Sequence, residues 1–241
     1  MGIAHAQNIG IQQAMNFGDD FILLSDQDSL PTDHMVKTLL AGFYKALERG
    51  ENVAAVGPIT IDERNSGTTL LWENTRWGPR RIDHPEQVGD LVEAAFLIAS
   101  GCLIEVQALK KIGSMRGEWF IDHIDLEWGL RARANGFKLF GVSAAHLHHS
   151  LGDTTRDIPG RSRGIHIHSP IRNYYMTRNT LFLIGSPLFS FGWKVNYVLW
   201  ITKYTLYYMV AVHPRWKRTR LLWRGILDAL RKKTGPLRKT I

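Results

Sequence analysis

The chain has 241 residues, of which 44% are hydrophobic and 22% are charged. Both values are close to the globular average, which excludes a disordered, collagen-like or disulfide-scaffold protein. The net charge of +8 comes from the C-terminus, because residues 215–241 hold ten Lys or Arg and one acid, whereas residues 1–214 hold 20 basic and 21 acidic residues. This distribution disfavours a nucleic-acid-binding protein and favours a tail that contacts an anionic surface.

Helices and strands are predicted to alternate in the first part of the chain. Residues 6–17 predict a short helix, and the apolar run 20–25 predicts a buried strand. An acidic turn follows at residues 26–28, then a helix over residues 33–50 and a strand over residues 53–57. The side chains expected on the buried face of the second helix are Val36, Leu39, Leu40, Phe43 and Leu47. This order is typical of an α/β sheet with crossover connections.

The middle of the chain continues the same pattern. Residues 62–90 are polar and predict a loop or a weak hairpin, and residues 91–99 predict another strand. A short helix is expected over residues 105–112, and a second helix begins within residues 119–131 and ends near Gly136. Residues 137–142 then predict a strand.

An apolar and aromatic segment, residues 181–212, precedes the basic tail. Pro187, Lys194 and Lys203 interrupt it, so its charge-free stretches are shorter than the roughly 20 residues that a membrane-spanning helix needs. We therefore expect an interfacial amphipathic segment, with the basic tail beside it as an electrostatic anchor.

Two carboxylates, Asp26 and Asp28, directly follow the first predicted strand. Open parallel sheets bind ligands beyond the carboxyl ends of their strands, and paired carboxylates suit a hard divalent cation that bridges substrate phosphates. A turn or helix-capping aspartate is the structural alternative. The pairing of the two favours a functional role.

A second acidic group, Asp122, Asp125 and Glu127, lies at the start of a predicted helix. One carboxylate could serve as a general base while Arg131 or Arg133 holds its neighbours. Acidic residues are also stabilised at a helix N-terminus by the exposed amides. The spacing alone does not decide between these two interpretations.

Histidines cluster near the end of the predicted sheet, followed by polar and aromatic residues. Histidine can complete a carboxylate metal site, and arginine can bind a diphosphate, although a histidine is more often a hydrogen-bonded structural residue. The members of the cluster are His146, His148, His149, His166, His168, Arg172, Tyr174, Tyr175, Arg178 and Asn179.

Six segments in order resemble the family 2 glycosyltransferases, in particular their bacterial rhamnosyltransferase branch. The segments are GIAHAQNIGI (2–11), LSDQDS (24–29), ASGC (99–102), FIDHIDLEW (120–128) with LRARA (130–134), HSLGD (149–153) and HSPIRNYY (168–175). The resemblance implies a GT-A fold, that is, a Rossmann-like mixed α/β sheet flanked by helices, here with a C-terminal apolar and basic helical extension.

The resemblance also implies roles for individual residues. Asp26 and Asp28 match the DxD motif, which holds the metal ion and the donor diphosphate. Asp125 matches the base that deprotonates the acceptor, and His149 matches a histidine that completes the metal site. The further residues expected to bind substrate, besides Asp26, are Asp122, Glu127, Arg172, Tyr175 and Arg178.

The implied reaction is an inverting, metal-dependent glycosyl transfer with Mg²⁺ or Mn²⁺. The expected donor is dTDP-L-rhamnose, and the expected acceptor is a cell-surface polysaccharide on a lipid carrier. An enzyme of this kind would act as a peripheral protein at the cytoplasmic face of the bacterial inner membrane, against anionic lipid, and no nucleic-acid partner is expected.

Compared with the family, the chain begins at the Asn-x-Gly-Ile-Ala stretch, after the strands that cradle the nucleotide base. We therefore expect a partial GT-A domain over residues 1–180, N-terminally truncated, and a membrane-associated helical region over residues 181–241. The alternative is a catalytically impaired fragment that only binds a membrane or a partner.

Overall fold

The computed structural model of the chain describes residues 2–62, 68–149, 154–156 and 165–237. The elements up to the end of the large sheet are α1 (Ile3–Phe17), β1 (Phe21–Leu23), β2 (Ser29–Pro31), α2 (Met35–Glu48), β3 (Val53–Asp62), β4 (Thr68–Thr69), β5 (Trp72–Thr75), β6 (Gly78–Arg81), α3 (Pro85–Val88), β7 (Leu91–Glu93), β8 (Leu103–Glu105), α4 (Val106–Ile112), a 3-10 turn (Gly117–Trp119), α5 (Ile124–Ala134) and β9 (Lys138–His149). They are followed by β10 (Thr154–Arg156), β11 (Ile165–Ile167), α6 (Pro170–Gly185), α7 (Phe191–Val210) and α8 (Arg215–Leu230).

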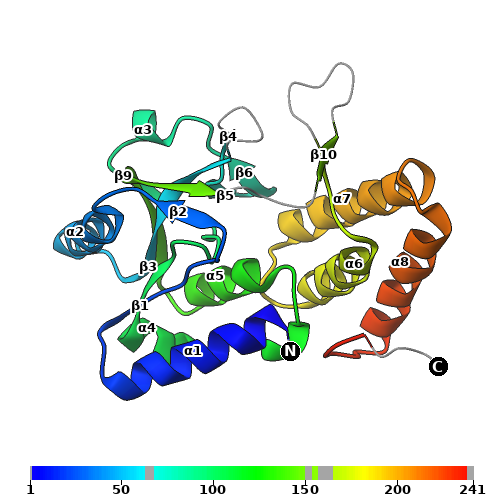
Figure 1. The fold of residues 1–241 in the computed structure, drawn as a ribbon, viewed down its shortest axis with the longest axis horizontal. Coiled ribbons are helices and arrows are strands. Elements are labelled where there is room, and N and C mark those ends of the chain that lie inside the picture. Colours follow the sequence, from blue (N-terminus) through cyan, green and yellow to red (C-terminus); the bar gives the residue numbers. More distant parts are fainter. Residues whose placement is uncertain (1, 63–67, 150–153, 157–164, 238–241) are drawn as a thin grey trace.

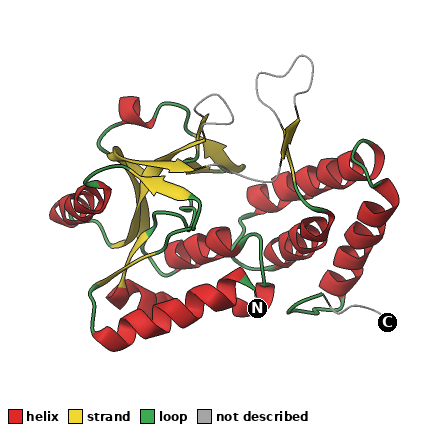
Figure 2. Ribbon diagram, viewed as in Figure 1, coloured by secondary structure: helices red, strands yellow, loops and turns green. Residues whose placement is uncertain are grey.

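The large sheet is mixed. Its strand order is β1-β8-β3-β9-β2, with β4 paired to β3 and β7 paired to β9. The long strands β3 and β9 run parallel, and the other pairs in this sheet are antiparallel. Two hairpins, β5–β6 and β10–β11, stand apart from it (Figure 2). The mixed α/β sheet flanked by helices is therefore confirmed.

Helices cover both faces of this sheet (Figure 1). Because successive side chains of a strand point to opposite faces, Leu139 and Phe140 of β9 belong to two different cores. Phe140 packs in the core under α2, whereas Leu139 packs in the larger core with α1, α4 and α5. The second layer, α1 with α4 and α5, carries the acidic motif predicted at residues 122–127.

The predicted buried face of α2 is wrong by part of a turn. Its buried residues are Met35, Leu39, Gly42, Phe43 and Ala46, whereas Val36 and Leu47 are 43% and 42% exposed. Gly42 explains the difference, because a Cβ atom there would lie 2.6 Å from Cγ2 of Val142. Small residues let the helix approach β9 closely, and a pattern read only from large apolar residues does not detect that contact.

Two predictions about strands also need correction. The strand expected over residues 91–99 is limited to β7. Beyond β7 the chain leaves the sheet, and the backbone N–H groups of Ala94 and Ala95 donate single hydrogen bonds to the carbonyls of Leu139 and Trp72. The strand next to β1 is β8, which was not predicted and runs antiparallel to it. The sequence argument assumed that the acidic turn follows a strand of a parallel pair. In the structure the strand before the turn, β1, is instead paired with an antiparallel neighbour.

Three helices, α6, α7 and α8, pack against one another at the C-terminal end of the molecule (Figure 1). The predicted C-terminal helical extension is thus confirmed, and the expected division at residue 180 stays a prediction. Among the helices of the described residues, none is both long enough and apolar enough to cross a membrane.

Candidate active site

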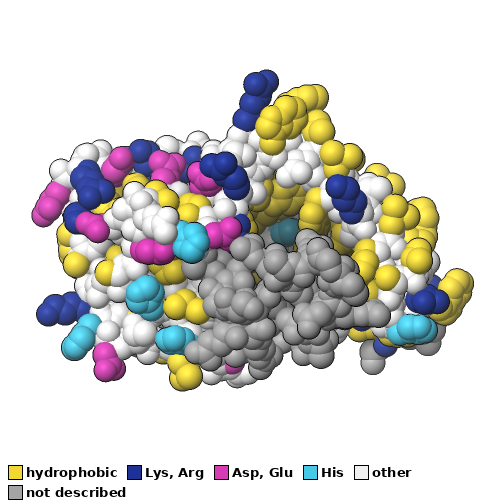
Figure 3. Space-filling model, turned by 90° about the horizontal axis from the view of Figure 1, so that it is seen from above, with side chains coloured by type: hydrophobic (Ala, Val, Ile, Leu, Met, Phe, Trp, Pro, Cys, Tyr) yellow, Lys and Arg dark blue, Asp and Glu magenta, His cyan; other side chains and the backbone are white. Residues whose placement is uncertain are grey.

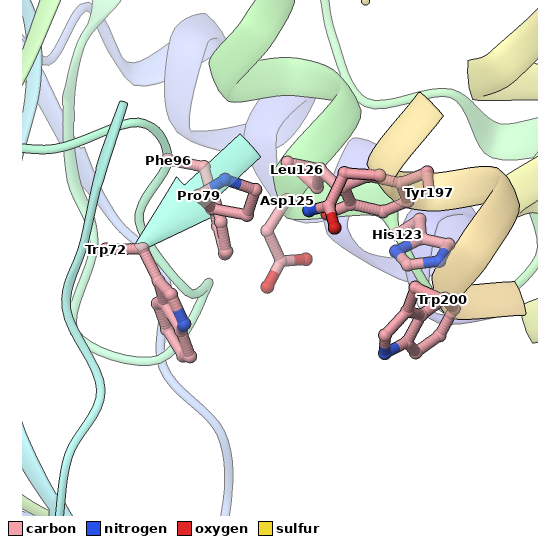
Figure 4. Close-up of a pocket in the computed structure, with 9 residues that line it drawn as sticks. Trp72, Pro79, Phe96, His123, Asp125, Leu126, Tyr197 and Trp200 are labelled. Carbon is pink, nitrogen blue, oxygen red and sulfur yellow. The ribbon is translucent and has the colours of Figure 1, made fainter. Parts of the chain in front are cut away.

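Asp125 lies in the first turn of α5, with its carboxylate at the floor of a pocket of about 450 Å³. One wall of the pocket comes from the β5–β6 hairpin and the segment after β7, and the other from α7. Figure 4 shows the carboxylate of Asp125 between these walls. The lining residues are Trp72, Pro79, Phe96, His123, Asp125, Leu126, Asn196, Tyr197 and Trp200.

The environment of Asp125 changes its acidity. The pKa of its carboxyl group is raised to about 6, mainly by burial and to a smaller extent by the charges of Asp26 and Asp122. The backbone N–H of Ala99 opposes this effect by donating a hydrogen bond of 3.1 Å to Oδ2. A carboxylate with a pKa near 6 is ionised at neutral pH and accepts a proton more readily than an ordinary aspartate. Asp125 therefore has the chemistry of a general base.

The turn that leads into α5 has an unusual backbone. Three of its residues have positive φ angles, namely Phe120 (72°), Asp122 (67°) and His123 (61°). This conformation is unfavourable for residues other than glycine and persists only where surrounding contacts enforce it. Asn179 of α6 supplies such contacts, because its Nδ2 donates to the backbone carbonyls of Trp119, Ile121 and Asp122. Helix α6 therefore fixes the turn that positions Asp125.

Two of the predicted substrate-binding residues, Asp122 and Arg172, contact each other. The Arg172 guanidinium donates to Oδ1 of Asp122 from Nε at 3.1 Å and from Nη2 at 2.5 Å. The Asp122 side chain is buried, while that of Arg172 is partly exposed. The structure thus joins these two residues next to the pocket, at the junction of α5 and α6.

His123 lines the pocket, although the sequence analysis did not select it. Its Nε2 lies 2.7 Å from the Thr180 hydroxyl oxygen. Burial, and then the charge of Arg172, lower the pKa of its imidazole to about 4. His123 is therefore neutral at physiological pH and serves the pocket as a hydrogen-bonding group without charge.

Three other predicted substrate-binding residues lie in the interior, away from the pocket. Glu127 is completely buried and pairs with Arg116 at 2.6 Å and with Arg131 at 2.9 Å. The hydroxyl of Tyr175 accepts a hydrogen bond from the backbone N–H of Leu237. Arg178 is also completely buried, and its guanidinium donates to the carbonyls of Trp119 and Gly235. The contacts of these side chains are structural, and a role in binding substrate stays a prediction.

The acidic turn joins β1 to β2, and the side chains of Asp26 and Asp28 are exposed there. The Asp26 backbone N–H donates to the hydroxyl of Ser100 at 3.4 Å. The register of β2 with β9 places Ser29 opposite His149, so the predicted metal ligands are close along the backbone. The His149 side chain, and residues 150–153 of its motif, lie outside the described residues. Within the described part, no group of three His, Cys, Asp or Glu suits a metal ion.

The aromatic walls of the pocket were missed by the sequence analysis. Trp72 stacks on Phe96 with ring centroids 5.0 Å apart, and on α7 Tyr197 packs beside Trp200 at 5.9 Å. The only available signal was the presence of tryptophans in a polar loop and in an apolar helix. Their convergence depends on contacts between distant parts of the chain.

Comparison with known proteins identifies a protein of similar sequence. No family model matches the chain. It is 32% identical over 183 residues to the dTDP-rhamnosyl transferase RfbF of Shigella flexneri, a match that covers 76% of this chain and 60% of that protein. The chain therefore spans less than two thirds of this relative's length.

Two solved structures show a weak likeness. GalNAc-T7, solved with UDP, GalNAc and Mn²⁺, gives a TM-score of 0.47 at 12% identity over 88% of this chain and 45% of that one. TarS of S. aureus, solved with UDP-GlcNAc, gives a TM-score of 0.48 at 11% identity over 92% and 60%. Because both TM-scores are below 0.5, the likeness of the chain to known proteins rests on the sequence match. In sequence the chain is similar to a bacterial dTDP-rhamnosyl transferase, in agreement with the resemblance of its motifs.

Proposed function

We propose that the protein is an inverting glycosyltransferase that transfers rhamnose from dTDP-L-rhamnose to a saccharide on a lipid carrier. The sequence match to a dTDP-rhamnosyl transferase supports the donor and the reaction class. The observation that carries the proposal is the position of Asp125, a carboxylate with a raised pKa at the floor of an aromatic pocket.

In the proposed reaction, the acceptor hydroxyl oxygen attacks the anomeric carbon of the donor. The bond between that carbon and the diphosphate oxygen breaks, and the diphosphate leaves with the electron pair. Asp125 takes the proton of the attacking hydroxyl. The backbone N–H of Ala99 donates a hydrogen bond to this carboxylate and orients it. The base is therefore already in position when the acceptor binds.

Asp26 and Asp28 suit the diphosphate end of the donor. Exposed carboxylates in a turn are ligands that Mg²⁺ and Mn²⁺ accept, and these ions commonly bind through one or two carboxylates together with substrate phosphates. A cation held there would stabilise the negative charge of the departing diphosphate. The charge of Asp26 contributes to the raised pKa of Asp125, so the acidic turn lies within electrostatic range of the proposed base.

The aromatic walls suit the acceptor. Trp72, Tyr197 and Trp200 present flat apolar faces next to Asp125, while Asn196 and His123 add hydrogen-bonding groups. A mostly apolar cleft with a few polar groups is typical of a small-molecule site, and the apolar face of a sugar ring can pack on such rings. A lipid-linked acceptor would place the enzyme at the cytoplasmic face of the inner membrane.

Calorimetry of donor binding tests the proposal. We expect dTDP-L-rhamnose to bind the wild-type protein more tightly with Mn²⁺ than without it, and Asp28→Ala to remove that difference. Asp19→Ala, at an exposed residue outside the turn, is the control. Metal-dependent binding that survives in Asp28→Ala would contradict the assignment. A folded wild-type protein that neither binds nor hydrolyses the donor would instead favour a chain that only binds a membrane or partner.

A further inference from the structure

Helix α8 exposes a stripe of apolar residues, which we call the α8 stripe. It consists of Trp216, Trp223, Leu227 and Leu230. Spacings of three, four and seven residues place these side chains on one helical face. Trp216 is 74% exposed and Trp223 is 54% exposed, although large aromatic side chains are usually buried in a folded protein. Figure 3 shows such hydrophobic side chains, with Lys and Arg between them, over the helical end of the molecule.

The opposite face of α8 is fixed to the rest of the protein. Its buried residues are Arg218, Leu222, Gly225, Asp228 and Ala229. A Cβ atom on Gly225 would lie 2.7 Å from the carbonyl oxygen of Tyr174, so α8 approaches the backbone of α6 closely. The hydroxyl of Tyr174 also donates to Asp228 at 3.0 Å. The helix therefore cannot turn to bury the α8 stripe without losing these contacts.

The charges around the α8 stripe are almost all positive. The exposed cations on the helix and just beyond it are Arg215, Lys217, Arg220, Arg231, Lys232 and Lys233. Asp228 is the one acid of residues 215–241, and it is buried and paired with Arg224 and Lys233. The exposed face of α8 therefore combines tryptophans and leucines with cations and presents no exposed acid.

We propose that the α8 stripe docks on the surface of an anionic lipid bilayer. Tryptophan and leucine side chains partition into the headgroup region, and surrounding Lys and Arg attract anionic lipids. A second copy of this chain is disfavoured as the occupant, because the two positive faces would repel each other. The proposal locates the membrane contact of the proposed enzyme on one helix face, and its test measures lipid binding without reference to catalysis.

The experiment measures the binding of the full chain to vesicles of phosphatidylcholine with phosphatidylglycerol, and to vesicles of phosphatidylcholine alone. We expect binding to the anionic vesicles that weakens at high salt. Trp216→Ala combined with Trp223→Ala should lower the partition coefficient by about tenfold or more, because two large apolar side chains are lost. Arg220→Glu should lower it by about fivefold or more. Trp77→Ala removes an exposed tryptophan in the turn of the β5–β6 hairpin, outside α8, and should leave binding unchanged.

Circular dichroism checks that each variant keeps its helices, and sedimentation without lipid measures its oligomeric state. Equal binding by the wild type and the double variant, with both folded, would overturn the proposal. A wild-type dimer that the double variant converts to a monomer would also overturn it, because the α8 stripe would then be an interface between copies. Loss of donor binding with intact vesicle binding would contradict only the proposed enzymatic function.

Discussion

Arg172 donates two hydrogen bonds to a single carboxylate oxygen of Asp122, across 50 residues of sequence. Arg172 lies in the first turn of α6, and Asp122 lies in the strained turn that precedes α5. Their ion pair therefore ties the two helices together beside Asp125.

Arg172→Ala should destabilise the protein. Removal of the guanidinium leaves a buried carboxylate without its charged partner, which in a pair that is partly open to solvent should lower the free energy of unfolding by about 2–3 kcal/mol. Urea unfolding measures this. Arg80→Ala, which breaks an exposed pair with Glu73, should lower it by about 1 kcal/mol or less. Equal effects of the two substitutions would contradict a structural role for the Arg172 pair.

Trp200→Ala should weaken binding of the acceptor and leave binding of the donor unchanged. The Trp200 ring lines the wall opposite Trp72, so its loss removes an apolar surface against which a sugar can pack. We expect the acceptor KM to rise about five- to tenfold. The matched control is Trp77→Ala, which removes a more exposed tryptophan that does not line this pocket. A change in donor affinity with an unchanged acceptor KM would place the donor, and not the acceptor, on this wall.

The sequence was sufficient to predict elements whose signal is local. Residues 6–17 show a helical pattern that ends before Gly18, and α1 ends there with Gly18 in the left-handed conformation. Asp125 was predicted at the start of a helix and found at the floor of a pocket, because the first turn of α5 carries it there. Local periodicity and end signals were enough for these features.

Features that depend on distant contacts were not predictable. Glu127 and Asp125 occupy the same helix turn and look alike in the sequence, yet Glu127 is neutralised in the core by Arg116 and Arg131. Trp72 and Trp200 line the same pocket only because the β5–β6 hairpin and α7, which are far apart in the sequence, both lie beside the first turn of α5. The alternation of burial in a single segment does not carry this information.

Asp125→Asn should stabilise the protein at alkaline pH. The pKa of Asp125 is raised from 3.8 to about 6 in the folded state, so folding favours the protonated form. The stability that this form contributes is present in acid and is lost as the pH rises through about 4 to 6. Asparagine imitates the protonated form and avoids the loss, which should add about 3 kcal/mol near pH 8, about half of that near pH 5 and little near pH 3.

Urea unfolding at pH 8 and at pH 3 checks this prediction. The control is Asp19→Asn at an exposed position, which should change stability little at either pH. A destabilised Asp125→Asn protein near pH 8 would show that the ionised carboxylate serves the fold, as a helix-capping residue would.

The central claim is that Asp125 takes the proton of the acceptor hydroxyl. Steady-state transfer of rhamnose from dTDP-L-rhamnose by Asp125→Asn, with donor affinity measured by calorimetry, tests it most directly. Because asparagine keeps the shape but lacks the basicity, kcat should fall by about 10²- to 10⁴-fold while donor affinity stays within about twofold, and Asp19→Asn should match the wild type. An Asp125→Asn protein that folds, binds the donor and transfers rhamnose within a few-fold of the wild-type rate would contradict the claim.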